Sequence, residues 1–196
     1  MYLLGHLGLA LLVAAPVAFV LVRAGRTRAT CAGTGALLGS VMLPDADLFV
    51  SRLAHRGLTH SVWAALVLGG LFATVAWRLG GGRGPRNRAA FGFGVGATSV
   101  VAHLAGDVIT PMGIRPFAPL SDVEYSLALV ASRNPAANLA LFVAGVVVFG
   151  HAVALARAGA DVPAPTGDAS ATAADRDETR AVTTPDVADA GPASGD

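Results

Sequence analysis

Apolar segments long enough to cross a membrane make up most of residues 1–157 and limit what this chain can fold into. Residues 1–22 carry no formal charge, and further apolar segments cover residues 29–44, 58–79, 89–110 and 134–157. A helix needs about 20 apolar residues to cross the hydrocarbon layer of a bilayer. The composition agrees, because 54% of the 196 residues are hydrophobic and only 14% are charged. The pattern predicts an all-α, polytopic membrane protein with about five transmembrane helices.

The composition changes close to residue 159. Residues 1–160 contain 12 arginines and 5 acidic residues, whereas residues 161–196 contain 2 arginines and 8 acidic residues. A segment with almost no large apolar side chains cannot bury enough surface to offset the entropy lost on ordering. We therefore expect a transmembrane domain over residues 1–158 and a disordered acidic tail over residues 159–196.

Arginine counts in the four connections predict the topology. The connections at residues 23–28, 45–57, 78–88 and 111–135 contain 3, 2, 4 and 2 arginines. Because cytoplasmic loops carry the excess of positive charge, the first and third connections are predicted to lie inside. This gives a multi-pass cell-membrane protein with its N-terminus outside and its tail in the cytoplasm. The third connection has no aromatic residue, so no nucleic-acid partner is expected.

A histidine and a carboxylate lie together at the end of the fourth apolar segment. His103 and Asp107 are four residues apart, so they share one face of a helix. An ionisable side chain at membrane depth costs about 2.5–3.5 kcal/mol on the insertion scale. Two of them on one face therefore need a partner, a cavity or a metal ion.

Three other segments carry side chains of the same kind. His6 lies in the first turns of the chain, where a lone histidine also occurs as a helix-packing residue. Asp45 and Asp47 follow Pro44, a pattern that suits a solvated helix terminator as well as a pair of oxygen ligands.

His55 and His60 flank Gly57 at the start of the third apolar segment. Residues five apart do not share a helical face, but a turn at the glycine would fold one ring back over the other. Both a solvated pair and a ligand pair remain open. Thr59 is a candidate N-cap for the third helix.

In the predicted topology these groups all lie near the outer face: His6, Asp45, Asp47, His55, His60, His103 and Asp107. His151 falls at the opposite end of its helix and is left out of the site. Cys31 is the only cysteine, so a metal ion would be held by nitrogen and oxygen ligands. Such a set suits zinc, with manganese or iron as alternatives, and indicates metal-assisted hydrolysis.

The motifs at residues 5–6, 43–47, 55–61 and 103–113 resemble a known family. Through them residues 1–150 are similar to the YdjM-type membrane-bound, metal-dependent hydrolases, described as bacterial inner-membrane proteins under LexA control. The order of an N-terminal histidine, an aspartate, a histidine and a final histidine–aspartate pair is also similar to zinc-dependent phospholipase C and P1-type nuclease.

This second resemblance implies how the ligands are shared. It places Asp45, His60, His103 and Asp107 on one ion, with His6 and a shared Asp107 on a second. The chain lacks a second histidine–aspartate pair at four-residue spacing, so one or two ions are expected rather than three.

The remaining polar residues are assigned supporting roles. Asp47 or His55 is the expected general base or orienting partner. Arg56 is expected to grip an anionic group, because the planar fork of its guanidinium suits phosphate.

The expected function is hydrolysis of an ester or phosphoester of a lipid or envelope component by metal-activated water. A metal or proton transporter is the main alternative, and it would spread polar groups through the membrane thickness. A non-catalytic scaffold with a structural metal is the other, and its protein ligands would fill every coordination position.

Overall fold

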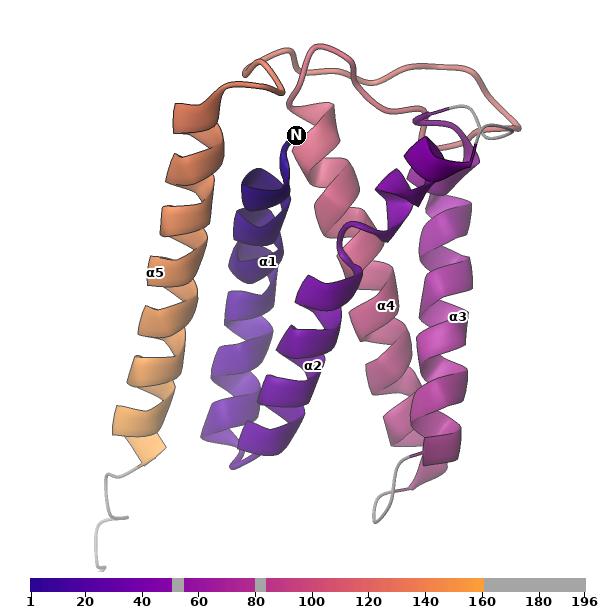
Figure 1. Ribbon diagram of the computed structural model, residues 1–196. Coiled ribbons are helices and arrows are strands. Elements are labelled where there is room, and N and C mark those ends of the chain that lie inside the picture. The colour runs from indigo at the N-terminus through magenta and orange to yellow at the C-terminus, as the bar shows by residue number, and fades with distance from the viewer. Residues whose placement is uncertain (51–54, 80–83, 161–196) are drawn as a thin grey trace, which may run out of the picture. The chain divides into compact units, whose positions relative to one another are not determined.

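The computed structural model describes residues 1–50, 55–79 and 84–160, and this part of the chain is helical (Figure 1). The elements in chain order are α1 (Leu3–Arg23), α2 (Thr27–Ser40), the 3₁₀ segments η1 (Leu43–Phe49) and η2 (Leu58–His60), α3 (Val62–Leu79), α4 (Pro85–Val108) and α5 (Pro135–Ala160). Within the described ranges there is no strand, and one isolated antiparallel bridge joins Ile114 to Tyr125. The predicted all-α class with five helices is confirmed. Nearly all of the predicted acidic tail lies outside the described residues.

Four of the helices are long and apolar enough to cross a membrane: α1, α3, α4 and α5. The second predicted span differs, because α2 has only 14 residues. At about 1.5 Å per residue it covers about 21 Å, which is short of the roughly 30 Å hydrocarbon layer. The helix ends before Pro44, and η1 continues the chain. The described residues therefore form four candidate spans and one shorter helix, α2.

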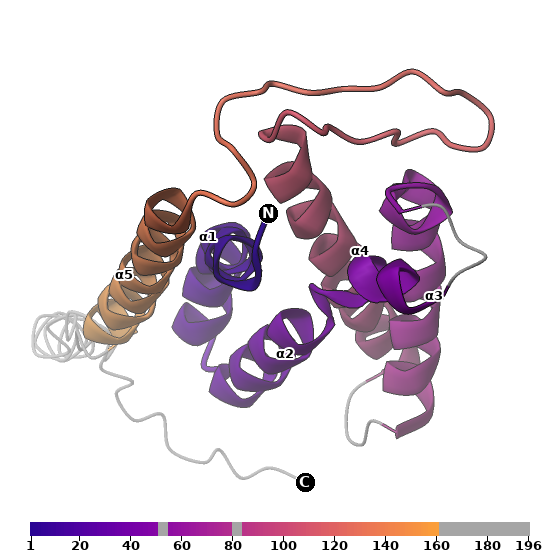
Figure 2. The same ribbon diagram turned by 45° about the horizontal axis from the view of Figure 1, so that its top comes forward.

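Helices α1, α2 and α4 contact one another, while α5 packs on α1 and α3 packs on α4 (Figures 1 and 2). Glycines bring the outer pairs close together. A Cβ atom on Gly8 would overlap the backbone of Leu141 in α5, and one on Gly92 would overlap the carbonyl group of Phe72 in α3. Small residues allow this backbone contact between membrane helices. Each outer helix is thereby seated against one of the three central helices.

The two ends of the bundle differ in charge. At one end the described residues carry seven arginines: Arg23, Arg26, Arg28, Arg78, Arg86, Arg88 and Arg157. All five carboxylates of the described residues lie at the other end: Asp45, Asp47, Asp107, Asp122 and Glu124. The connection between α4 and α5 crosses this second end (Figure 2). We call the two ends the arginine end and the carboxylate end.

An apolar layer fills the space between α1, α2 and α4 just below the carboxylate end. It consists of the buried residues Ala10, Leu37, Val41 and Ala102. Ala10 lies one helical turn beyond His6, and Ala102 directly precedes His103. The layer therefore forms the floor beneath the histidines described next.

Candidate metal site

Four side chains from three segments point their donor atoms at one spot at the carboxylate end. His103 and Asp107 lie one turn apart on α4, His60 ends η2, and Asp45 lies in η1. The Nε2 atoms of His60 and His103 are 3.1 Å apart. Asp45 Oδ1 lies 3.2 Å from His60 Nε2 and 3.3 Å from His103 Nε2. Asp107 Oδ2 lies 3.4 Å from each of the same two nitrogens.

These distances match the spacing of ligands around one ion. A tetrahedral ion bound at 2.0–2.1 Å holds neighbouring donor atoms about 3.3 Å apart. Two imidazole nitrogens and two carboxylate oxygens form a donor set that suits Zn²⁺, with Mn²⁺ and Fe²⁺ also compatible. The four residues could therefore hold one divalent metal ion.

The unsatisfied polar atoms support the same interpretation. The two histidine rings and Asp107 are at most 1% exposed, yet Asp107 Oδ2 has no hydrogen-bond partner among the described residues. A buried polar atom without a partner is rare and costly. Two Nε2 atoms that face each other at 3.1 Å can share at most one proton, so at least one of them is a free acceptor that a cation could use.

The carboxylates in η1 are ionised. Burial alone would raise the pKa of Asp45, but hydrogen bonds from His103 and His60 outweigh it and hold the pKa well below its usual range. Burial likewise acts upward on the pKa of Asp47, and hydrogen bonds from Thr59 and His55 bring it below the ordinary value. Burial lowers the pKa of His60, whereas Asp107 and Asp45 raise it more strongly. Negative charge therefore collects on the side of the site formed by η1.

Asp47 lies behind His60 and holds its neighbours in place. Its Oδ2 accepts the Thr59 hydroxyl at 2.6 Å and lies 3.3 Å from His60 Nδ1. Its Oδ1 pairs with His55 Nδ1 at 2.9 Å. A carboxylate behind the second nitrogen of a metal-ligating histidine fixes the ring and its tautomer. The geometry suits such an orienting partner.

The turn at Gly57 brings His55 back towards His60, with ring centroids 5.3 Å apart. The predicted cap is wrong. Thr59 does not cap α3, because residues 58–60 form η2 and α3 begins only at Val62. Its hydroxyl donates to Asp47 instead.

His6 is buried next to the four-residue group but lies outside it. Its ring stacks on His103 with centroids 3.9 Å apart, and its Nε2 is 3.7 Å from Asp107 Oδ1. Neither ring nitrogen has a hydrogen-bond partner within the described residues. Gly106 makes room for the ring, because a Cβ atom there would come within 2.6 Å of His6 Nδ1.

Arg56 is buried and engaged by the protein. Its Nη2 donates to Asp107 Oδ1 at 2.9 Å, and its Nη1 donates to the carbonyl oxygen of Gly113 at 2.7 Å. The same Asp107 oxygen also accepts the amino group of Met1 at 2.7 Å. Two positive groups on Oδ1 disfavour a second cation there and leave Oδ2 to face the histidines.

A cavity of about 160 Å³ borders the site. Its lining residues are His55, Arg56, Met112, Gly113, Ile114, Arg115 and Glu124. His55 and Arg56 thus separate the cavity from Asp47 and Asp107. The side chain of Asp45 is 20% exposed, so the site is also open on the side of η1.

Asn138 is a supporting residue that lies outside the sequence motifs of the predicted site. It lies on α5, is 2% exposed, and accepts the backbone N–H of Tyr2 at 3.0 Å. Its amide nitrogen donates to two carbonyl groups, those of Ser132 and Asn134. It thereby fixes the start of α1, which carries His6. An asparagine in an apolar segment is the one signal that marks it.

Comparison with known proteins agrees with the motifs. No curated protein and no solved structure matches this chain. The family model described as "YdjM inner membrane protein" matches residues 1–168, which include all the helices of the described residues and every residue of the site. With four candidate spans and a His/Asp cluster at one end, the chain belongs to the YdjM inner membrane protein family.

Proposed function

We propose that this protein is a membrane-bound, metal-dependent hydrolase that acts on an ester or phosphoester of a lipid or envelope component. The observation that carries the proposal is the convergence of two histidine nitrogens and two carboxylate oxygens within 3.1–3.4 Å. Asp45, His60, His103 and Asp107 would hold the ion. Bound there, a divalent ion supplies Lewis-acid chemistry and makes water acidic enough to serve as a nucleophile near neutral pH.

The neighbouring residues are suited to moving a proton. His55 borders the cavity, its side chain is 34% exposed, and Asp47 holds its Nδ1. A carboxylate that orients an imidazole in this way leaves Nε2 as the proton acceptor. We assign His55 as the general base and Asp47 as the residue that positions both His55 and His60.

We assign Arg56 two roles. It holds Asp107 in place, and it lines the cavity in which the substrate would bind. Two of its nitrogens are used within the protein, while Nε has no hydrogen-bond partner in the described part of the chain. Arg115 is the second positive side chain on the cavity, and its only described ion pair is a 3.8 Å contact with the exposed Asp122. An anionic ester would therefore meet two guanidinium groups in the cavity.

We further propose that the carboxylate end faces the extracytoplasmic side. The arginine end holds seven arginines and none of the described carboxylates, which fits the excess of positive charge expected on the cytoplasmic side. The substrate would then approach from the outer leaflet.

A structural metal is the alternative that the four protein donors favour, because four ligands can close a tetrahedral site. A turnover assay distinguishes the two. Purified protein would be stripped with a chelator, reloaded with Zn²⁺, Mn²⁺ or Fe²⁺, and assayed on a chromogenic phosphodiester and on a short-chain lipid ester. We expect hydrolysis only after reloading and at least 100-fold less in His55→Ala, with bound metal unchanged. A stable, fully loaded protein that hydrolyses neither probe would contradict catalysis and leave a structural site.

Asp47→Asn tests the orienting role. Because outer partners of metal ligands typically contribute 10–100-fold to metal affinity, we expect the Kd for the ion to rise by about that factor. The pH profile of turnover should also change, since His55 loses the carboxylate that sets its tautomer. Asp122→Asn, an exposed carboxylate in the α4–α5 connection, is the matched control and should change neither measurement. An unaltered metal affinity in Asp47→Asn would show that His60 needs no such support.

A further inference from the structure

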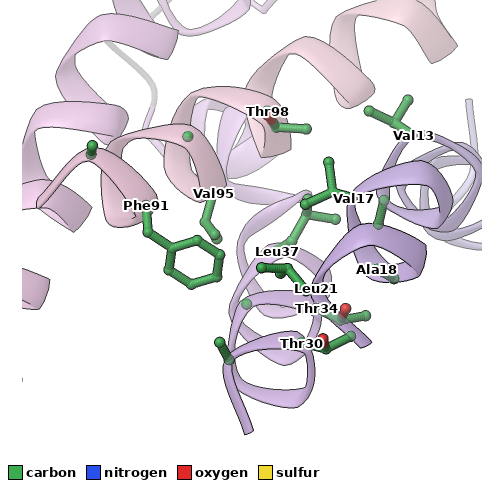
Figure 3. A pocket seen from close by; sticks show the side chains of 15 residues that line it. Val13, Val17, Ala18, Leu21, Thr30, Thr34, Leu37, Phe91, Val95 and Thr98 are labelled. Atoms are coloured by element: carbon green, nitrogen blue, oxygen red, sulfur yellow. The ribbon is translucent and has the colours of Figure 1, made fainter. Parts of the chain in front are cut away.

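The strongest feature outside the metal site is an apolar groove on the arginine-end half of the bundle (Figure 3). It has a volume of about 270 Å³ and lies between α1, α2 and α4. Val13 and Val17 of α1 face Phe91 and Val95 of α4 across it. From Val13 to Leu21 the groove follows α1 over a rise of about 12 Å. Helices α1 and α4 are candidate spans, so the groove lies at the depth of acyl chains.

The groove continues into a second cavity with a different lining. This cavity, of about 530 Å³, shares Leu21, Ala29 and Phe91 with the groove. Its remaining lining residues are Arg26, Val75, Ala76, Leu79, Asn87 and Arg88. The groove is apolar within the membrane and opens between two arginines and an asparagine at the arginine end. This order of apolar and polar surfaces matches a phospholipid whose acyl chain lies in the groove and whose headgroup lies at the arginine end.

The charges around this mouth strengthen the match. The mouth lies at the arginine end, where the described part of the chain places no carboxylate. Arg26 is exposed at the start of α2, and Arg88 donates to the carbonyl group of Trp77 at 3.4 Å, which holds it at the wall of the cavity. Basic pockets between membrane helices bind anionic lipid headgroups. The positive-inside rule alone explains why arginines gather at this end. It does not explain why an apolar groove begins next to two of them.

We propose that the two cavities together form a binding site for one anionic phospholipid. The phosphate lies between Arg26 and Arg88, and one acyl chain follows the groove towards Val13. The apolar layer of Ala10, Leu37, Val41 and Ala102 separates this lipid from the His/Asp site. This lipid is therefore a structural lipid, distinct from the substrate of the proposed hydrolase.

The test measures lipid retention by native mass spectrometry of the full chain released from detergent. The probes are phosphatidylglycerol and phosphatidylcholine with identical palmitoyl and oleoyl chains. With about tenfold preference expected from two arginines, the protein should keep one phosphatidylglycerol under conditions that remove phosphatidylcholine. Equal retention of the two lipids, or displacement of phosphatidylglycerol by excess inorganic phosphate alone, would overturn the proposal.

Variants separate the two halves of the site. Arg26→Gln with Arg88→Gln should lower phosphatidylglycerol retention to the phosphatidylcholine level, whereas Arg78→Gln with Arg157→Gln, at the same end but outside the lining, should keep it. Arg26→Gln alone leaves the contact of Arg88 with Trp77 and should lose part of the preference.

Two glycines give a matched steric pair. A Cβ atom on Gly94 meets nothing within 4 Å and projects from a residue of the groove, so Gly94→Leu should fill it and reduce retention of both lipids. Gly70 is equally open but does not line the groove, so Gly70→Leu should retain them. Bound metal should be the same in all these proteins, which keeps this test independent of the proposed catalysis. Retention unaffected by Gly94→Leu and by the arginine pair would place the lipid elsewhere and refute the site.

Discussion

His103→Ala is expected to remove the metal ion from the purified protein. The wild type should contain close to one equivalent of transition metal per chain by elemental analysis, and the variant less than one tenth of that. His103 supplies one of the four converging donor atoms, at 3.1 Å from His60 Nε2 and 3.3 Å from Asp45 Oδ1. Loss of a direct ligand should exceed the 10–100-fold effect of an outer partner, so we expect affinity to fall by more than about 100-fold.

His151→Ala is the control for this experiment. His151 is an exposed histidine of α5 that lies on the arginine-end half and borders an apolar surface with Leu155 and Val148. Its replacement should leave the metal content unchanged. His60→Ala offers a second ligand variant in a different element, which guards against a local packing defect in α4. Full metal content in both ligand variants, with the helical circular dichroism intact, would refute the assigned ligands.

Asp107→Leu is expected to destabilise the metal-free protein strongly. Asp107 Oδ1 accepts hydrogen bonds from Arg56 and from the amino group of Met1 in a site that is 1% exposed. Removal of one partner of a buried ion pair leaves an uncompensated charge and typically costs about 3–5 kcal/mol. Unfolding of chelator-treated protein in detergent should show a free energy of unfolding lowered by about that amount.

Two further variants test the cause of the loss. Asp122→Leu removes an exposed carboxylate that is 3.8 Å from Arg115, and an exposed pair contributes less than about 1 kcal/mol. Arg56→Met combined with Asp107→Leu should recover part of the loss, because Arg56 no longer remains as a buried charge, while the Met1 amino group still lacks its partner. If Asp107→Leu and Asp122→Leu cost the same, the buried pair does not stabilise the fold.

The helices could be predicted from length and apolarity, with one exception. Residues 1–22, 58–79, 89–110 and 134–157 correspond to helices that are candidate spans, since burial in lipid requires continuous apolar character. The segment at residues 29–44, which is rich in small residues, is predicted to form a span but forms a helix of only 14 residues. Pro44 is the second residue of η1, and the chain must turn there to bring Asp45 to His60. Local composition does not reveal such a long-range requirement.

The residue types of the site could be predicted from the sequence, but the contact partners of each residue could not. Spacing along α4 shows that His103 and Asp107 share a face, because helical geometry is local. That Arg56 turns inward to Asp107 depends on a positive φ of 61° at Arg56 and on the carbonyl group of Gly113, 57 residues away. The support of α1 by Asn138 spans 136 residues. Contacts of this kind depend on how the helices and loops pack together, and no periodic pattern in the sequence predicts them.

The apolar floor beneath the histidines determines from which side ions can reach them. Ala10, Val41 and Ala102 are completely buried, and Leu37 is 4% exposed, so among the described residues this layer offers a hydrated ion no polar side chain between α1, α2 and α4. A cation at the carboxylate end would therefore meet an apolar barrier in the direction of the arginine end. The layer would act as an electrical insulator, and most of the membrane voltage would fall below the site rather than across it. A barrier of this kind suits chemistry carried out at the carboxylate end and opposes ion conduction between the two ends.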